Sequence, residues 1–280
     1  MSNVEHYTTD IRKGVRTGNL TLHDRLTRGR LMSQPVERFG VISGMIETAE
    51  NLAKDHDISR EACDAYAARS HQRAAAAWAN GLFNDELVPI SIAQRKGDPI
   101  IFDHDEGYRE DATAETMAAL RPLEGGVVTA GNASQISDAG SAIVMMSKRA
   151  AEKRGIKPLG EFVSYGMVAG PDNASLLHQP SRSILRALER AGKKVSDVDL
   201  FEINEAFAAV GIASMRELGI SDDIVNVNGG AIALGHPIGM SGNRLALTLL
   251  HELKRRGGGM GAAALCGGGG QGDALVVRTV

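Results

Sequence analysis

The sequence predicts an α/β fold, and three segments with a similar arrangement support that prediction. Residues 199–209, 226–245 and 262–272 each place a short apolar run before a turn or a helix-like pattern. From residue 126 onward, strand-like and helix-like runs alternate, which is typical of a layered α/β domain. We therefore divide the chain into a first domain over 1–125 and a second over 126–280.

Composition excludes several classes of protein. The 280 residues are enough for a large core, and the net charge of −3 gives no general attraction to nucleic acid or to an anionic membrane. The two cysteines fit a reducing cytosol, and no metal-ligand spacing links them to the histidines. We find no signal peptide and no apolar run that could span a bilayer. We therefore expect a cytoplasmic protein without a metal, a nucleic-acid partner or a membrane span.

The first part of the chain is expected to be mainly helical. Residues 1–40 are polar and resemble a surface segment, whereas 41–79 carry two helices, with Ser59 as the N-cap of the second. Cys63 lies inside that helix without a glycine-rich turn or a neighbouring base, so we interpret it as structural. Residues 86–92 suggest a strand, followed by turns and loops up to residue 122.

The second part supplies the alternating elements. We expect strands at 127–130, 161–168, 199–203, 224–227, 261–266 and 273–278. Helices are expected at 139–154, from Pro180 to Gly192, over 205–218 with Asn204 as N-cap, and from Met240 onward.

Two residues in these turns could carry chemistry. His236 lies in a glycine-rich turn between a strand and a helix, where a structural histidine and a catalytic loop are about equally plausible. A third interpretation, a turn that binds a dinucleotide, is excluded because the glycine spacing does not match the dinucleotide-binding fingerprint. Cys266 alone resembles a small buried hydrophobe. Because it ends a strand before a run of bare backbone N–H groups, it is also a candidate acid or base beside an oxyanion site.

Three motifs, in this order along the chain, resemble the thiolase family. They are Asn-Glu-Ala-Phe from Asn204, Asn-Gly-Gly-Ala-Ile-Ala-x-Gly-His-Pro-x-Gly-x-Ser-Gly from Asn228, and Cys-Gly-Gly-Gly-x-Gly from Cys266. This family comprises the acetyl-CoA acetyltransferases and 3-ketoacyl-CoA thiolases. The resemblance implies a layered αβαβα fold of which the chain holds the C-terminal half and the loop domain. It makes 1–125 the loop domain with a remnant of the N-terminal half, and 126–280 the C-terminal thiolase domain.

The resemblance also implies roles for four residues. His236 would be the base that activates a nucleophilic cysteine, and Cys266 would exchange the α-proton of the second acyl group. Asn204, through a water, and His236 would form one oxyanion site, and the backbone N–H of Gly268 would contribute to another. No cofactor is implied, since coenzyme A thioesters are the substrates.

Four further residues match positions that meet coenzyme A in the family. Arg109 matches the arginine at the adenine end, although a surface arginine is the competing interpretation. Ser134 matches the serine beside the pantetheine arm, with a helix cap as the alternative. Phe207 belongs to the first motif, and Met45 lies where the family has a His-Met-Gly segment, without its histidine. Homodimers or homotetramers are the assemblies that the resemblance implies.

The nucleophilic cysteine of the family has no counterpart in this sequence. Met1 and Ser2 resemble the end of the segment that follows the nucleophile, so we expect an N-terminally truncated thiolase that is inactive alone. Two alternatives remain: a non-catalytic thiolase-like protein that binds coenzyme A or acyl lipids, and a subunit that a separate chain completes. Residues 176–183 depart from the family pattern, and His178 is given no catalytic role.

Overall fold

A four-stranded sheet forms the centre of the protein. The computed structural model describes residues 7–9, 17–24, 28, 37, 44–170 and 178–280. The strand order is β5 (Gly160–Ala169), β8 (Gln271–Thr279), β7 (Met260–Gly267) and β6 (Leu200–Ile203). β6 and β7 are parallel, and the other two pairs are antiparallel. The predicted α/β class is therefore confirmed.

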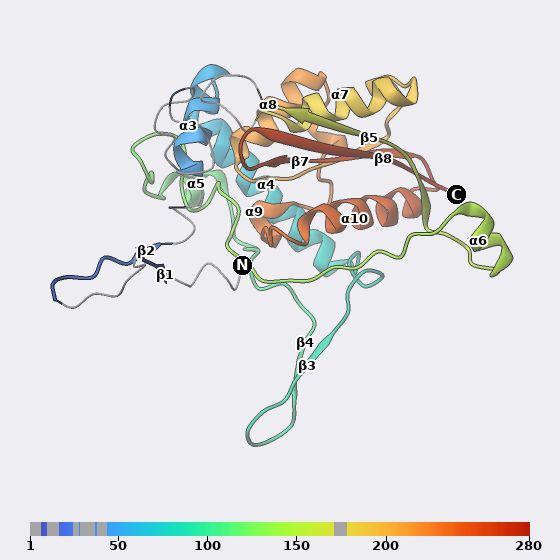
Figure 1. Cartoon of the computed structure of the whole chain (residues 1–280), viewed down its shortest axis with the longest axis horizontal. Coiled ribbons are helices and arrows are strands. Elements are labelled where there is room, and N and C mark those ends of the chain that lie inside the picture. The colour runs from blue at the N-terminus through green and yellow to red at the C-terminus, as the bar shows by residue number, and fades with distance from the viewer. Residues whose placement is uncertain (1–6, 10–16, 25–27, 29–36, 38–43, 171–177) are drawn as a thin grey trace.

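Helices cover both faces of this sheet (Figure 1). α7 (Pro180–Ala191) packs on one face through Ile184, Ala187 and Leu188, together with the end of α8 (Ala208–Leu218). α10 (Ser241–Arg255) packs on the other face through Leu245, Leu249 and Leu253, which recur every four residues. The helix expected from Met240 is thus confirmed, as is the one from Pro180 to Gly192, where Gly192 is the left-handed C-cap.

A second core joins α8 to the helices before residue 80. α3 (Met45–Asp55) and α4 (Arg60–Ala79) pack against α8, and α4 also packs against α9 (Ala231–Leu234). Ser59 caps α4, as predicted, by accepting a hydrogen bond from the Ala62 N–H at 3.2 Å. α5 (Ala114–Ala118) contacts α4, and α6 (Lys148–Lys153) lies farther along the chain. Among the described residues, no helix has both the length and the apolar content needed to cross a bilayer.

The described residues also include two short antiparallel strand pairs and two 3-10 turns. β1 (Tyr7–Thr8) pairs with β2 (His23–Asp24), and β3 (Ile90–Ile92) forms a hairpin with β4 (Ile100–Phe102). The hairpin projects from the body of the molecule (Figure 1). Two 3-10 turns, η2 (Val195–Asp197) and η3 (Asp222–Ile224), precede β6 and the glycine-rich turn.

Two predictions for the chain after residue 126, a strand at 127–130 and a helix over 139–154, were wrong. Residues 127–130 form only an isolated bridge, between Thr129 and Pro122, because the N–H groups of Val127 and Val128 donate to the carboxylate of Glu50 at 2.9 and 2.8 Å. The helix expected over 139–154 is reduced to α6, which Ser147 caps, and 139–147 are irregular. Four consecutive apolar residues, 143–146, give this segment no amphipathic face that could anchor a helix.

Three further expectations need correction, and a fourth falls mostly outside the described residues. The strand expected at 86–92 is limited to Ile90–Ile92. Residues 224–227 contribute only a bridge between Val225 and Phe201, and the helix expected from 205 begins at Ala208. Most of 1–40, including Met1 and Ser2, lies outside the described residues.

Candidate active site

His236 is held on the short loop between α9 and α10. Gly235 ends α9 with φ +89°, a backbone conformation that is strained for any residue with a side chain. The backbone N–H of His236 donates to the carbonyl of Gln135 at 3.2 Å. Gln135 in turn donates through its amide to the carbonyls of Gly107 and Ile232. The loop is therefore tied to two other segments and is rigidly placed.

Both ring nitrogens of His236 have polar partners. Nδ1 lies 2.6 Å from Oγ of Ser241, and Nε2 lies 3.3 Å from Nδ2 of Asn204. The Ser241 hydroxyl donates its single hydrogen to the carbonyl of Pro237 at 3.0 Å, so it accepts from Nδ1–H. Nε2 of the neutral ring then carries a lone pair and accepts from the Asn204 amide. This tautomer leaves Nε2 as the basic atom.

The surroundings of His236 favour its neutral form. Burial lowers the pKa of His236 below its ordinary value, and the positive charge of Arg244 lowers it further. The imidazole is therefore unprotonated at neutral pH. That is the state a general base requires before it accepts a proton.

Asn204 is not the helix N-cap that the sequence suggested. The N-cap of α8 is Phe207, and the chain stays non-helical from Asn204 to that residue. The Asn204 N–H instead donates to the carbonyl of Ala264 at 2.9 Å, which extends the pairing of β6 with β7. The Asn204 side chain is fully buried and turned toward His236. Tertiary pairing thus overrides the local capping preference.

Cys266 stands at the same end of the sheet. β6 and β7 are parallel, so their carboxyl ends meet at one edge, where Asn204 follows β6 and Cys266 lies near the end of β7. Cys266 is half-buried and packs against the core that contains Phe207 and, at its border, Met45. Burial raises the pKa of the Cys266 thiol to about 11. The thiol is therefore protonated at neutral pH.

The other predicted site residues lie at different depths. Gly268 is exposed in the turn after β7, with open space where a Cβ would stand. Ser134 is half-buried, and its N–H donates to the carbonyl of Ala206 at 3.0 Å, beside the bridge between Ala133 and Phe207. Arg109 is exposed; its backbone N–H donates to Nδ1 of His71 at 3.1 Å, and its carbonyl accepts from the Ala112 N–H at 3.3 Å. The structure therefore joins Ser134 to the first motif and leaves Arg109 at the surface.

Cys63 and His178 stand apart from this cluster. Cys63 is buried in α4, where burial and the charge of Asp64 raise its pKa to about 12. Nε2 of His178 lies 2.7 Å from the Glu217 carboxylate, on the α7 side of the sheet. Within the described ranges, no group of three or more histidine, cysteine, aspartate or glutamate side chains could hold a metal ion.

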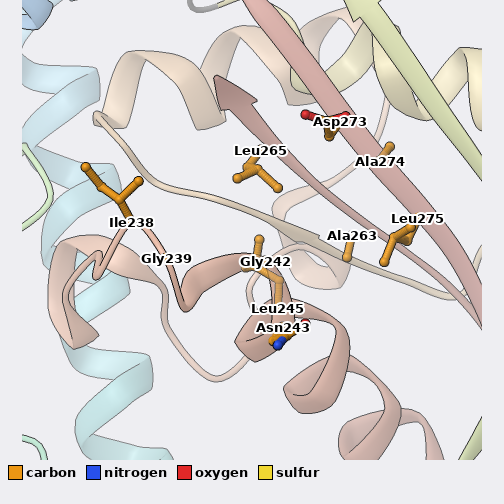
Figure 2. Close-up of a pocket in the computed structure, with 10 residues that line it drawn as sticks. All are labelled: Ile238, Gly239, Gly242, Asn243, Leu245, Ala263, Leu265, Asp273, Ala274 and Leu275. Carbon is orange, nitrogen blue, oxygen red and sulfur yellow. The ribbon is translucent and has the colours of Figure 1, made fainter. Parts of the chain in front are cut away.

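A cavity of about 380 Å³ opens between the first turn of α10 and the strands β7 and β8 (Figure 2). Leu265, Leu245 and Asp273 are among its lining residues. Because side chains alternate along a strand, Cys266 faces the opposite side of β7 from Leu265. The cavity therefore lies on the other face of β7 from the Cys266 side chain, and the turn after His236 forms part of its rim.

Sequence reasoning missed three residues that shape this site. Ser241 sets the tautomer of His236, and Gln135 anchors its backbone. Arg244 lowers the pKa of the imidazole from the first turn of α10. Ser241 and Arg244 lie five and eight residues after His236, at the start of a predicted helix. That spacing is a signal that each could face the histidine.

Family comparison covers almost the whole chain. Residues 1–149 match the thiolase N-terminal domain, and residues 156–279 match the thiolase C-terminal domain. A probable acetyl-CoA acetyltransferase of Mycolicibacterium smegmatis is 50% identical over 280 residues, which are 99% of this chain and 71% of that protein. An acetyl-CoA acetyltransferase of Chromobacterium violaceum is 46% identical over 99% of this chain and 70% of its own length.

Solved structures agree with the sequence comparison. The Bacillus anthracis acetyl-CoA acetyltransferase superposes with a TM-score of 0.90 at 40% identity, over 98% of this chain and 68% of that one. A human mitochondrial 3-ketoacyl-CoA thiolase in complex with CoA superposes with a TM-score of 0.86 at 38% identity, over 98% and 67%. The fold is the thiolase fold, and the chain belongs to the thiolase family of acyltransferases.

Proposed function

We propose that these 280 residues carry the acid–base part of a thiolase site and act on the α-carbon of a coenzyme A thioester. One observation carries the proposal: Ser241, His236 and Asn204 form a hydrogen-bonded chain at the sheet edge where Cys266 lies near the end of β7. The family comparisons and the human relative solved with CoA support the choice of substrate.

Each residue has a role that follows from its surroundings. The neutral Nε2 of His236 accepts a proton from an attacking thiol, and the Asn204 amide donates toward the same region. The Cys266 thiol, protonated because its pKa is raised to about 11, is the acid that returns a proton to a departing enolate in thiolysis. Removal of the α-proton in the reverse direction needs its thiolate. Gly268 offers a backbone N–H to the thioester oxygen.

The covalent step needs a nucleophilic thiol that neither cysteine supplies. Cys63 is buried with its pKa raised to about 12, and Cys266 is engaged as the acid. We therefore expect the chain by itself to bind coenzyme A without completing thiolysis of acetoacetyl-CoA. A single turnover by the purified chain would contradict this part of the proposal.

Exchange of the acetyl-CoA methyl hydrogens for deuterium tests the acid–base part directly. This exchange needs only a base, an acid and an enolate site, so it does not depend on a covalent intermediate. In deuterium oxide we expect the chain to accelerate exchange above the buffer rate, measured by proton NMR. Cys266→Ser and Asn204→Ala should lower the rate, whereas Cys63→Ser is the matched control and should not.

Two outcomes separate the proposal from a binding role. Coenzyme A binding in calorimetry together with no exchange would favour a non-catalytic module and would overturn the catalytic proposal. Exchange that survives Cys266→Ser would show that another group moves the proton.

A further inference from the structure

A buried hydrogen bond between Arg244 and Glu202 lies beside the site and joins the two elements that carry its polar residues. Nη1 of Arg244 lies 3.2 Å from Oε2 of Glu202, and the two side chains are 13% and 3% exposed. Glu202 precedes Asn204 by two residues, so strand alternation places both on the α10 face of β6. Arg244 follows Ser241 by three residues in the first turn of α10.

Two contacts therefore cross the same junction. Asn204 meets His236 at 3.3 Å, and Glu202 meets Arg244 at 3.2 Å. The start of α10 bears Ser241, which binds Nδ1 of the imidazole. A shift of this helix relative to β6 would consequently move the ring away from Asn204.

We propose that Glu202 and Arg244 are positioning residues for His236: the pair locks the first turn of α10 to the end of β6 and holds a positive charge near the imidazole. The proposal rests on the function above only in taking His236 as the base. It assigns a role to two side chains that do not belong to the predicted catalytic set.

Other charged groups also face Arg244. Glu86 and Asp105, from the segment after α4, both experience the Arg244 charge, which opposes the upward effect of burial on their pKa values. Oε2 of Glu86 accepts from Oγ1 of Thr248 on α10 at 2.7 Å. Oε1 of Glu86 and Nη2 of Arg244 are buried without a hydrogen-bond partner among the described residues. Thr248 thus connects α10 to this segment, whereas Arg244 acts on it through its charge.

The protonation state of Glu202 determines how strongly the Arg244 charge acts on the His236 imidazole. Burial raises the pKa of Glu202 to about 8, with further increases from Glu205 and Glu86 and an opposing effect from Arg244. Below that pH, Glu202 is mainly protonated and bonds to Arg244 without cancelling its charge. The guanidinium therefore keeps its effect on the imidazole, whose pKa it lowers.

The experiment is an NMR titration of the His236 Cε1–H in the 280-residue chain without substrate, assigned by loss of the signal in His236→Ala. Arg244→Met removes the charge, and we expect the His236 titration to move to higher pH. Arg244→Lys keeps the charge and should stay close to the wild-type chain. Arg255→Met removes a pair with Glu252 on the same helix and is the control that should produce no shift.

A second pair of variants tests the positional part. Glu202→Ala leaves Arg244 unpaired, and we expect the His236 signal to broaden or shift as the contact with Asn204 loosens. Glu202→Gln preserves a hydrogen bond and should restore the wild-type spectrum.

Two outcomes would overturn the role proposed for Arg244 and Glu202. An unchanged His236 titration in folded Arg244→Met would refute the charge effect. If Arg244→Met fails to fold, an unchanged His236 spectrum in Glu202→Ala would overturn the positional effect. Because the titration needs no substrate, failure of the proposed function in the deuterium-exchange assay would leave this result interpretable.

Discussion

Glu205, in the first motif, has a structural task that its neighbour Asn204 does not share. Its side chain is 1% exposed and accepts hydrogen bonds from three donors: the Ser70 hydroxyl, the Asn226 amide and the Ile232 N–H. These donors come from α4, from the glycine-rich turn and from α9. The carboxylate therefore fixes the segments that surround the site.

Removing this carboxylate should destabilise the fold. For Glu205→Ala we expect the free energy of unfolding to fall by at least roughly 3 kcal/mol, since three buried donors are left unpaired and each costs about 1–3 kcal/mol. Urea unfolding followed by circular dichroism measures the change. Glu124→Ala, at an exposed carboxylate, is the control and should be neutral. A loss below 1 kcal/mol in Glu205→Ala would show that the donors find other partners.

The two cysteines should resist alkylation while the chain is folded. Burial raises the pKa of Cys63 to about 12 and of Cys266 to about 11, so at pH 8 only about one Cys266 thiol in a thousand is ionised. We expect slow labelling by iodoacetamide in buffer and rapid labelling in guanidinium chloride, resolved by mass spectrometry of the peptides. Equal rates for Cys266 in both conditions would contradict the raised pKa.

At the scale of elements, Gly229 sets how closely the glycine-rich turn approaches α4. Its φ is +82°, and a Cβ would stand 2.7 Å from the Ser70 carbonyl and 2.8 Å from the Ala74 N–H. Gly219 also has a positive φ, +65°, but a Cβ there would meet nothing within 4 Å. The two glycines thus separate backbone strain from steric overlap.

Alanine at the two positions should give different losses. Gly219→Ala is expected to cost about 1 kcal/mol, the strain of the left-handed conformation alone. Gly229→Ala adds an overlap that overpacking data place at about 1–3 kcal/mol more. We compare the two variants by thermal unfolding. Equal midpoints would contradict this expectation, because they would mean that α4 shifts to accommodate the added methyl group without loss of stability.

The free energy of unfolding should depend on pH through Glu202, which lies at the junction between β6 and α10. Its pKa rises from an ordinary 4.5 to about 8 in the folded chain. Between these values the unfolded carboxyl is ionised while the folded one keeps its proton, so stability is lost as pH rises through this window. Glu202→Gln cannot ionise, and its unfolding free energy should therefore increase relative to the wild-type chain from pH 5 to pH 8.

Glu252 on α10 is the control for that measurement. Its pKa is lowered by hydrogen bonds from Asn228, Arg256 and Arg255, which outweigh the effect of burial. It is ionised in both states above pH 5, so Glu252→Gln should show a difference that does not vary over the same range. A constant difference for Glu202→Gln would contradict the raised pKa of that carboxyl.

At the scale of the whole molecule, an apolar strip is open to solvent. Ile136, Val144 and Met145 are 83%, 85% and 74% exposed. They belong to the irregular segment that precedes α6, whose course Figure 1 shows. Exposed apolar segments of this kind mark protein–protein contacts or promote aggregation. We therefore expect the isolated chain to self-associate, with this segment contributing to the contact.

Light scattering at micromolar concentration tests the association. We expect a mass above that of one chain, and a lower mass after the joint change of Val144→Ser and Met145→Ser. Ile156→Ser, at a separate exposed apolar side chain, is the control and should keep the wild-type mass. A single-chain mass for the unchanged protein would refute this expectation.

The sequence by itself determined the elements whose signals are local. The leucine repeat of α10, the Ser59 cap of α4 and the end of α7 at Gly192 all depend on neighbours within one or two turns, and each was predicted. The motifs likewise indicated the family before any geometry was known, because their order and spacing are read directly from the chain.

Only the tertiary structure decided the features that need distant partners. Asn204 is a sheet-edge residue and no helix cap because Ala264 accepts its N–H, and 127–130 are no strand because Glu50 takes their N–H groups. The pairing of Arg244 with Glu202 joins positions 42 residues apart. Local propensity contributes only tenths of a kcal/mol to about 1 kcal/mol per residue, so a buried hydrogen bond or ion pair from elsewhere in the chain can outweigh it.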